Sequence, residues 1–476
     1  MPDGLSYLSE NSTCAMSTHD VADHNASDME DGAPAGVSPL EETPCQKKAR
    51  ELQERGWRRI IRNFTPSWFA VNMGTGIVSI LLHNLPYNGQ WLRFISYIFF
   101  GLNILLFVAF SCISLVRYIA YPGIWRAMIS HPGQSLFLGC FPMGFASMSQ
   151  RLHNPTITSL TWGDIPAPFS FLIFFHTQHA DFSQTAIINM MIFSCAQWGD
   201  WLVYLAWAFW WIDVLLSMAT AITMPFIVMH RHKPGLNNTT AALLLPIVPT
   251  VVAAATGGIV AEALPNHQHA FTTLIASYIL WGIGECLSAC VLALYFHRLT
   301  IHSLPPKEVI VSVFLPVGPL GQGGFGIQQL GKVAVKLLPA TPAFKTIGVD
   351  VARGAEILYV LGVFLGMVLW GFALVWVCFA LISLATIRDF PFNMGWWGFT
   401  FPLGVWATCT SMLAINLDSE FFKVATTIIS LSVLLLWMMV ASRTLCLAVR
   451  GDLFFAPCLK ELKEKEEREG DAGERV

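Results

Sequence analysis

Long apolar runs separated by short polar stretches occupy most of the chain. A helix needs about 20 mostly apolar residues to cross a lipid bilayer, and ten segments satisfy this requirement. These segments are residues 66–86, 91–119, 134–148 continued at 185–195, 198–226, 241–262, 268–297, 308–331, 354–386, 393–417 and 420–447. The pattern predicts an all-α integral membrane protein with ten transmembrane helices in the lipid bilayer.

Composition strengthens this prediction. Hydrophobic residues make up 54% of the 476 residues and charged residues only 12%, against about 25% charged in a soluble domain. The formal net charge of −3 gives no basic bias toward nucleic acid. Of the eleven cysteines none forms a CxxC pair, so we expect small buried apolar residues and no metal site. Because no nucleophile elbow, P-loop, HExxH or dinucleotide fingerprint occurs, we predict neither an enzyme nor a cofactor.

The polar ends of the chain indicate its orientation. Residues 1–54 read as a disordered tail, residues 55–450 as the ten-helix domain, and residues 451–476 as a charged tail. Residues 47–62 are basic and could also form an amphipathic helix on the membrane surface. Basic residues collect on the cytosolic side of membrane helices, and an even number of spans puts both termini there. The basic loop at 332–353 runs against this rule.

The third span is unusual because a polar stretch divides it. Residues 134–148 and 185–195 are each too short to cross a bilayer, and together they make one helix. We interpret residues 149–184 as an insertion within the third helix, such as retained non-coding sequence would produce.

Helix-breaking residues concentrate in the odd-numbered spans. Proline removes a helical hydrogen bond, and in lipid the freed carbonyls need partners inside the bundle or along a wet path. This pattern predicts an inner ring of five kinked odd-numbered helices around a pore and an outer ring of five even-numbered helices. The candidate pore-lining or helix-breaking residues are Gly74, Gly76, Pro142, Gly144, Pro246, Pro249, Pro316, Gly318, Pro319, Gly321, Gln322, Gly324 and Pro402.

The seventh span carries the strongest version of this pattern. Gly318, Gly321 and Gly324 recur every third residue and leave one helix face almost bare. Such a face permits either close helix packing or a backbone-lined pore, and the sequence leaves both possibilities open.

Charge divides the spans in the same way. The interiors of the odd-numbered spans carry no acidic or basic residue, whereas even-numbered spans contain Asp213 and Glu285. A carboxyl group inside a membrane is a candidate proton carrier, although pairing between helices would give it a structural role instead. A neutral, broken-helix pore suits a small anion, because helix N-termini offer partial positive charge.

Four stretches resemble fungal sulfite efflux pumps of the tellurite-resistance/dicarboxylate transporter family. They are RNFTPSWFAVNMGTGIVSILLHNLPY, WWIDVLLS, YFHRLTIHSLPPKEVIVSVFLPVGPLGQGGFGIQQLGK and GWWGFTFPLGVWATCTSMLA. The resemblance covers about residues 55–448 apart from the segment around 149–184. Malate permeases and plant guard-cell anion channels are relatives in the same family.

The resemblance implies a plasma-membrane homotrimer in which each protomer has its own pore, lined by the odd-numbered helices. It also implies a phenylalanine in the ninth helix that occludes the pore. Phe401 is the first candidate for this gate and Phe399 the second.

We therefore expect export of sulfite or bisulfite from the cytosol. A malate or C4-dicarboxylate permease and an uncoupled small-anion channel are the alternatives on the same fold. A membrane-embedded enzyme or a receptor has no supporting motif in the sequence.

Overall fold

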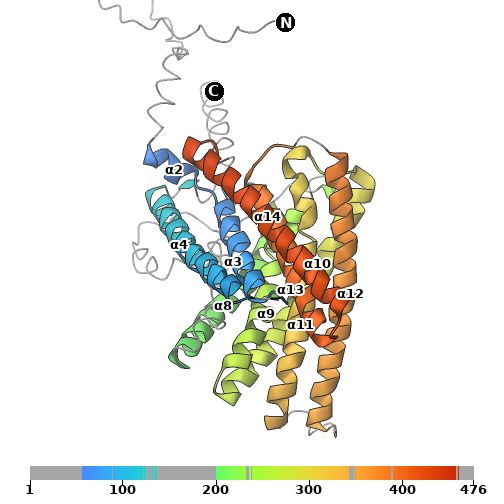
Figure 1. Cartoon of the computed structure of the whole chain (residues 1–476). Helices are drawn as coiled ribbons and strands as arrows, with labels where there is room; N and C mark the ends of the chain where they lie inside the picture. Colours follow the sequence, from blue (N-terminus) through green and yellow to red (C-terminus); the bar gives the residue numbers. More distant parts are fainter. Residues whose placement is uncertain are drawn as a thin grey trace, which may run out of the picture. The chain divides into compact units, whose positions relative to one another are not determined.

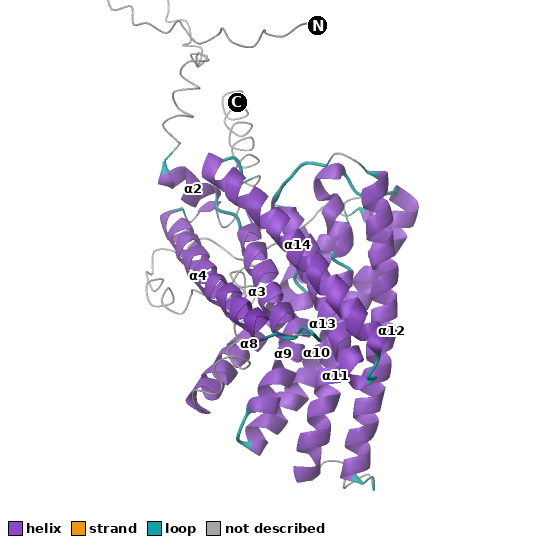
Figure 2. Cartoon of the chain, in the orientation of Figure 1, coloured by secondary structure: helices purple, strands orange, loops and turns teal. Residues whose placement is uncertain are grey.

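In a computed structural model of the chain, every regular element of the described part is a helix (Figure 2). The structure describes residues 56–456 and residue 459, except 137–199 and short gaps at 88, within 122–134, at 232–234, 237–238, 342–347, 349 and 388–389. Seven helices of this part are long and apolar enough to cross a membrane, or eight if one bent helix pair counts as a span. The prediction of an all-helical membrane protein is confirmed at this level, and a ten-helix count stays a prediction.

The even-numbered spans are long, continuous α-helices. Each is a single α-helix of 31 to 36 residues, and the fourth span has one proline, Pro225, inside its helix. They are α4 (Gln90–Ala120), α8 (Asp200–Arg231), α10 (His267–His302), α12 (Val351–Thr386) and α14 (Glu420–Arg450).

The described odd-numbered spans are built differently, because each starts with a 3₁₀ turn and then continues as a shorter α-helix. The α-helical parts have 15 to 21 residues. The four pairs are η1 (Pro66–Trp68) with α3 (Phe69–His83), η7 (Ala241–Leu244) with α9 (Val248–Ala263), η8 (Lys307–Phe314) with α11 (Val317–Leu337), and η11 (Met394–Phe399) with α13 (Thr400–Asn416). A short 3₁₀ turn, η9 (Leu338–Ala340), follows α11.

In the described odd-numbered spans the prolines lie at these junctions and not in α-helix interiors, which corrects our expectation of internal kinks there. Pro246 separates η7 from α9, and Pro249 is in the first turn of α9. Pro316 is the N-cap residue of α11, while Pro319 and Pro402 occupy the first turns of α11 and α13. Since the first N–H groups of an α-helix have no intrahelical partner, proline costs no hydrogen bond there.

Burial separates the two groups of helices. In the apolar stretch of Lys307–Ala340, 83% of positions are buried, and in Met394–Asn416, 78%. The corresponding shares are 17% in Phe94–Ala120 and 22% in Glu420–Arg450. The interrupted spans therefore form the interior of the bundle, and the continuous helices present large apolar side chains outward.

Helix α11 is the centre of the packing. It contacts α9, α10, α12 and α13, and α14 runs obliquely across α13 and α3 (Figure 1). Before α3 the chain turns sharply: α2 (Trp57–Asn63) makes an angle of 88° with the Pro66–His83 span.

Glycines allow neighbouring helices to approach α11 this closely. A Cβ atom at Gly321 would lie 2.7 Å from the backbone nitrogen of Trp406 in α13. A Cβ atom at Gly331 would lie 2.8 Å from the Cα atom of Tyr359 in α12. Because these contacts are with backbone atoms, no change of side-chain rotamer could relieve them.

We expect Gly321→Ala to destabilise the folded protein by about 1–3 kcal/mol, because α13 would have to move away from α11. Gly318→Ala is the matched control in the same helix, since a Cβ atom there would meet nothing within 4 Å. Thermal unfolding of the purified protein in detergent would measure both variants. Equal midpoints for the two variants would contradict close α11–α13 packing as a source of stability.

Candidate anion pathway

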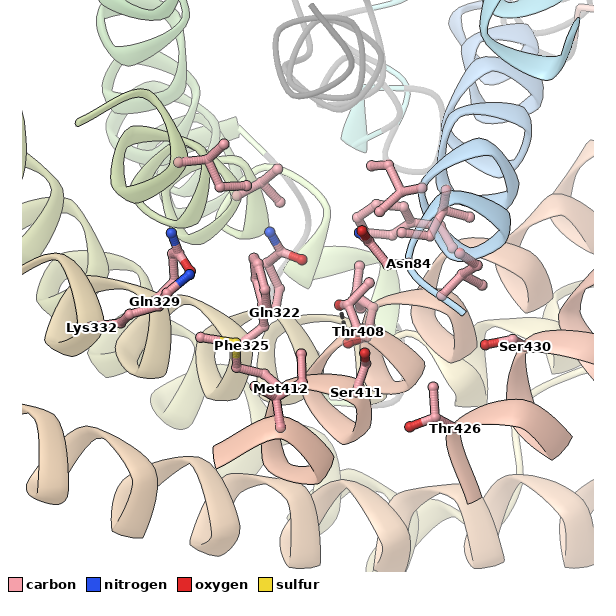
Figure 3. Close-up of a pocket in the computed structure, with 18 of the residues that line it drawn as sticks. Asn84, Gln322, Phe325, Gln329, Lys332, Thr408, Ser411, Met412, Thr426 and Ser430 are labelled. Carbon is pink, nitrogen blue, oxygen red and sulfur yellow. Dashed lines mark hydrogen bonds between the residues drawn. The ribbon is translucent and has the colours of Figure 1, made fainter. Parts of the chain in front are cut away.

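A cavity of about 220 Å³ lies between the interrupted helices. Its walls come from α3, α9, α11 and α13, and α14 adds the side chains of Thr426 and Ser430 (Figure 3). All four interrupted spans of the described chain thus face one space.

Each of the four helices gives the cavity one face. In α11 that face is Gln322, Phe325, Gln329 and Lys332, which recur at intervals of three and four residues. The remaining lining residues are Met73, Ile77, Ile80 and Leu81 of α3 with its C-cap residue Asn84, Val252, Ile259 and Glu262 of α9, and Phe401, Val405, Thr408, Ser411, Met412 and Ile415 of α13.

The glycines that the sequence singled out lie mainly on packing faces. Gly321 and Gly324 meet Trp406 and Cys409 of α13, so this part of the glycine face serves helix packing. Gly74 of α3 approaches Trp397 and Thr400 in the same manner. Neither Gly318 nor Gly76, which is buried in α3, is among the residues that line the cavity.

The two gate candidates occupy different places. Phe401, in the first turn of α13, is 7% exposed and lines the cavity. Phe399 ends η11 and packs edge-on against Phe314, with ring centroids 5.0 Å apart. Only Phe401 is therefore positioned to affect the cavity directly.

Polar side chains lie among the apolar residues of the cavity wall. The Gln322 side chain is 6% exposed and makes no hydrogen bond with the described residues, so its amide N–H groups are available. Thr408 directs its hydroxyl to the carbonyl of Val405 at 2.8 Å, and Ser411 lies one turn further along α13 (Figure 3). The predicted pore-lining residue Gln322 thus faces the cavity.

One end of the cavity carries the charges of Glu262 and Lys332, neither of which is among the predicted pore-lining residues. Glu262 accepts hydrogen bonds from Gln329 at 2.7 Å and Lys336 at 2.5 Å, and it lies 3.2 Å from Lys332 Nζ. Glu262 is the next-to-last residue of α9, and Lys332 follows the predicted seventh span, so both lay at the edges of apolar runs. The expectation of a neutral pore therefore needs correction at this end.

The two membrane acids lie away from the cavity. Asp213 is fully buried in α8. Glu285 of α10 lies against Gly323 on the far side of α11, and its buried Oε1 has no hydrogen-bond partner among the described residues. Trp281, one turn earlier, donates a hydrogen bond to the carbonyl of Gly323 at 2.9 Å.

Some sequence predictions concern residues outside the described part of the chain. Pro142 and Gly144 of the third span, and the suspected insertion at 149–184, belong to this group. Within the described part, no cluster of three or more His, Cys, Asp or Glu residues is arranged to hold a metal ion.

The sequence of the chain matches a known family. The sequence profile of the voltage-dependent anion channel family, SLAC1, matches residues 63–445. The chain belongs to this family. The matched region contains all four interrupted spans and every residue that lines the cavity.

Proteins of similar sequence carry the names of transporters. The chain is 42% identical over 409 residues to the sulfite efflux pump SSU1 of Arthroderma otae, covering 85% of this chain and 97% of that protein. It is also 42% identical to the SSU1 of Arthroderma benhamiae, over 88% of this chain and 99% of that one. The malic acid transport protein of Schizosaccharomyces pombe is 23% identical over 80% and 77% of the two chains.

We expect Asp213→Asn and Glu285→Gln to leave the pH dependence of anion flux unchanged. Neither side chain lines the cavity, so neither is placed to exchange a proton with a passing ion. Flux into proteoliposomes, measured across a series of external pH values, would test this. A flat pH profile in either variant, with a sloping profile in the parent protein, would identify that acid as a proton carrier.

Proposed function

We propose that this protein exports sulfite or bisulfite across the plasma membrane and thereby detoxifies sulfite. The observation that carries the proposal is the cavity shared by four interrupted helices, with amide, hydroxyl and ammonium donors on its wall. Such donors bind a small oxyanion without any covalent chemistry, which favours a transporter over an enzyme. The choice of sulfite rests on the SSU1 pumps, which are similar over almost their whole length.

The permeation path in this proposal follows the interrupted helices. They form the inner ring and the continuous helices the outer ring, with the third span completing a set of ten. The contrast in burial between the two groups supports this arrangement. The apolar outer faces would contact lipid and the other protomers of a homotrimer, which the family resemblance implies.

Phe401 is the gate in this proposal. The lining residues nearest the starts of α3, α9, α11 and α13 are Met73, Val252, Gln322 and Phe401, so the ring of Phe401 lies near one end of the cavity. Glu262 and Lys332 lie at the opposite end, close to the ends of α9 and α11.

The proposed orientation places both termini in the cytosol. The basic residues ahead of the first span support it through the positive-inside rule. An angle of 88° between α2 and α3 also suits a helix that lies along the membrane surface, with the exposed Trp57 ring at the interface. In this orientation the Phe401 end of the cavity faces the cytosol and the Glu262 end faces outward.

A dicarboxylate substrate receives less support. Two carboxylates are commonly bound by arginine forks, and the described residues that line the cavity include no arginine. The malic acid transport protein is also the more distant relative, at 23% identity against 42%.

Expression in a sulfite-sensitive, efflux-deficient yeast tests the proposal. We expect the protein to restore growth on sulfite and to lower intracellular sulfite. A parallel form without residues 149–184 would show whether this segment is compatible with transport. Failure of both forms on sulfite, together with uptake of labelled malate, would favour the dicarboxylate permease.

We expect Phe401→Ala to increase anion flux several-fold, because it removes the ring that narrows one end of the cavity. The control is Phe399→Leu, which keeps most of the packing volume against Phe314 and should leave the flux unchanged. Conductance in planar bilayers would compare the two variants with the parent protein. An unchanged Phe401→Ala conductance in well-folded protein would argue against Phe401 as the gate.

A further inference from the structure

The outward end of the cavity holds a compact group of one carboxylate, two ammonium groups and one amide. Glu262 and Lys332 are the only charged side chains among the described residues that line the cavity. Lys336 lies one turn beyond Lys332 on α11, and both ammonium groups reach Glu262 Oε1. Gln329 donates to the other carboxylate oxygen.

The two ammonium groups make this end of the cavity more favourable for an anion. The last turns of α9 and α11 carry partial negative charge from their free carbonyl groups, which repels an anion. Lys332 and Lys336 offset this charge, and both are partly exposed, with 39% and 57% of their side chains accessible. An oxyanion that passes the cavity end therefore meets two cations and an amide donor.

Glu262 already occupies these donors. A carboxylate and a sulfite-like oxyanion present the same kind of oxygen acceptors, so they compete for the same N–H groups. While Glu262 accepts from Gln329, Lys332 and Lys336, it takes one N–H of each group and offsets the positive charge of the two ammonium groups, so an anion binds there more weakly. The Glu262 side chain is 25% exposed, which leaves it room to turn away.

We propose that Glu262 is an internal competitor for the transported anion at the outer end of the pathway. Its carboxylate neutralises Lys332 and Lys336 between transport events, gives way when an anion arrives, and returns to displace it. The residue thus weakens anion binding at this end and promotes release. This inference rests on the proposed anion transport by the cavity and adds the residue that sets affinity there.

The test is Glu262→Gln in the full-length protein, reconstituted in liposomes with sulfite as the probe. Glutamine keeps the size of the side chain and removes the charge that competes with the anion. We expect the half-saturating sulfite concentration on the outer side to fall by about three- to fivefold, the range for a partly exposed ion pair. Adding Lys332→Gln and Lys336→Gln to this variant should abolish the gain in sulfite affinity, because the two ammonium groups that attract the anion are then absent.

Ionic strength separates this role from a structural one. Charges at the protein surface are screened beyond about 10 Å at 0.1 M salt, so the gain from Glu262→Gln should shrink as an impermeant salt is added. A purely structural role would reduce the amount of folded protein and would not produce a salt-dependent change in affinity. If Glu262→Gln folds poorly, Lys336→Gln alone gives the opposite test, since it should raise the half-saturating concentration.

The outcomes distinguish the two proposals. An unchanged or higher half-saturating concentration in folded Glu262→Gln protein would overturn the role of Glu262. A parent protein that carries nitrate but no sulfite would overturn the choice of substrate, and the same comparison would then be made with nitrate. A parent protein that carries neither anion would overturn both.

Discussion

Close backbone contact between α11 and its neighbours is the constraint on which the rest of the structure depends. Gly321 brings α11 against the backbone of α13, and Gly331 brings it against α12. Gly326 faces Ala255 of α9, and Gly323 leaves room for the side chain of Glu285 of α10. Lipid tails are as apolar as the side chains of these helices, so association in a membrane relies on such close packing more than on burial from water.

This packing decides which side chains reach the cavity. With four helices held against its glycine-bearing faces, α11 has one face left for Gln322, Phe325, Gln329 and Lys332. Each partner helix likewise turns one face inward. The proposed anion pathway is the space between these inward faces, which remains open because the glycine-bearing faces of α11 pack closely against its neighbours.

The apolar pattern alone predicted much of this architecture. A helix occupies each of the nine predicted spans that the structure describes, and the odd-numbered ones are interrupted. Proline and glycine signalled the interruptions because both act on the backbone locally. Their exact effect was less predictable, since Pro249 or Pro402 can kink a helix or begin one, and only the hydrogen bonds distinguish the two cases.

The site was harder to predict than the fold. Gly321 suits both packing and a pore, and only the position of Trp406 shows that it packs. Glu262 and Lys332 are 70 residues apart and stand at the ends of apolar runs, where charge is common. Their meeting depends on the parallel alignment of α9 and α11, which no local pattern contains. The family resemblance brought forward Phe401 and Phe399 without fixing the register, and only the position of the cavity distinguishes them.

The difference in helix length has a consequence for how the protein fits its membrane. At about 1.5 Å per residue, the 36 residues of α12 extend about 54 Å, whereas the hydrocarbon core is about 30 Å thick. The 17 residues of α13 extend only about 26 Å. The long helices must tilt or project into the headgroups, and α13 fits the core without doing either. A change in bilayer thickness would therefore act first on the tilt of the outer helices and leave the short helices around the cavity nearly undisturbed.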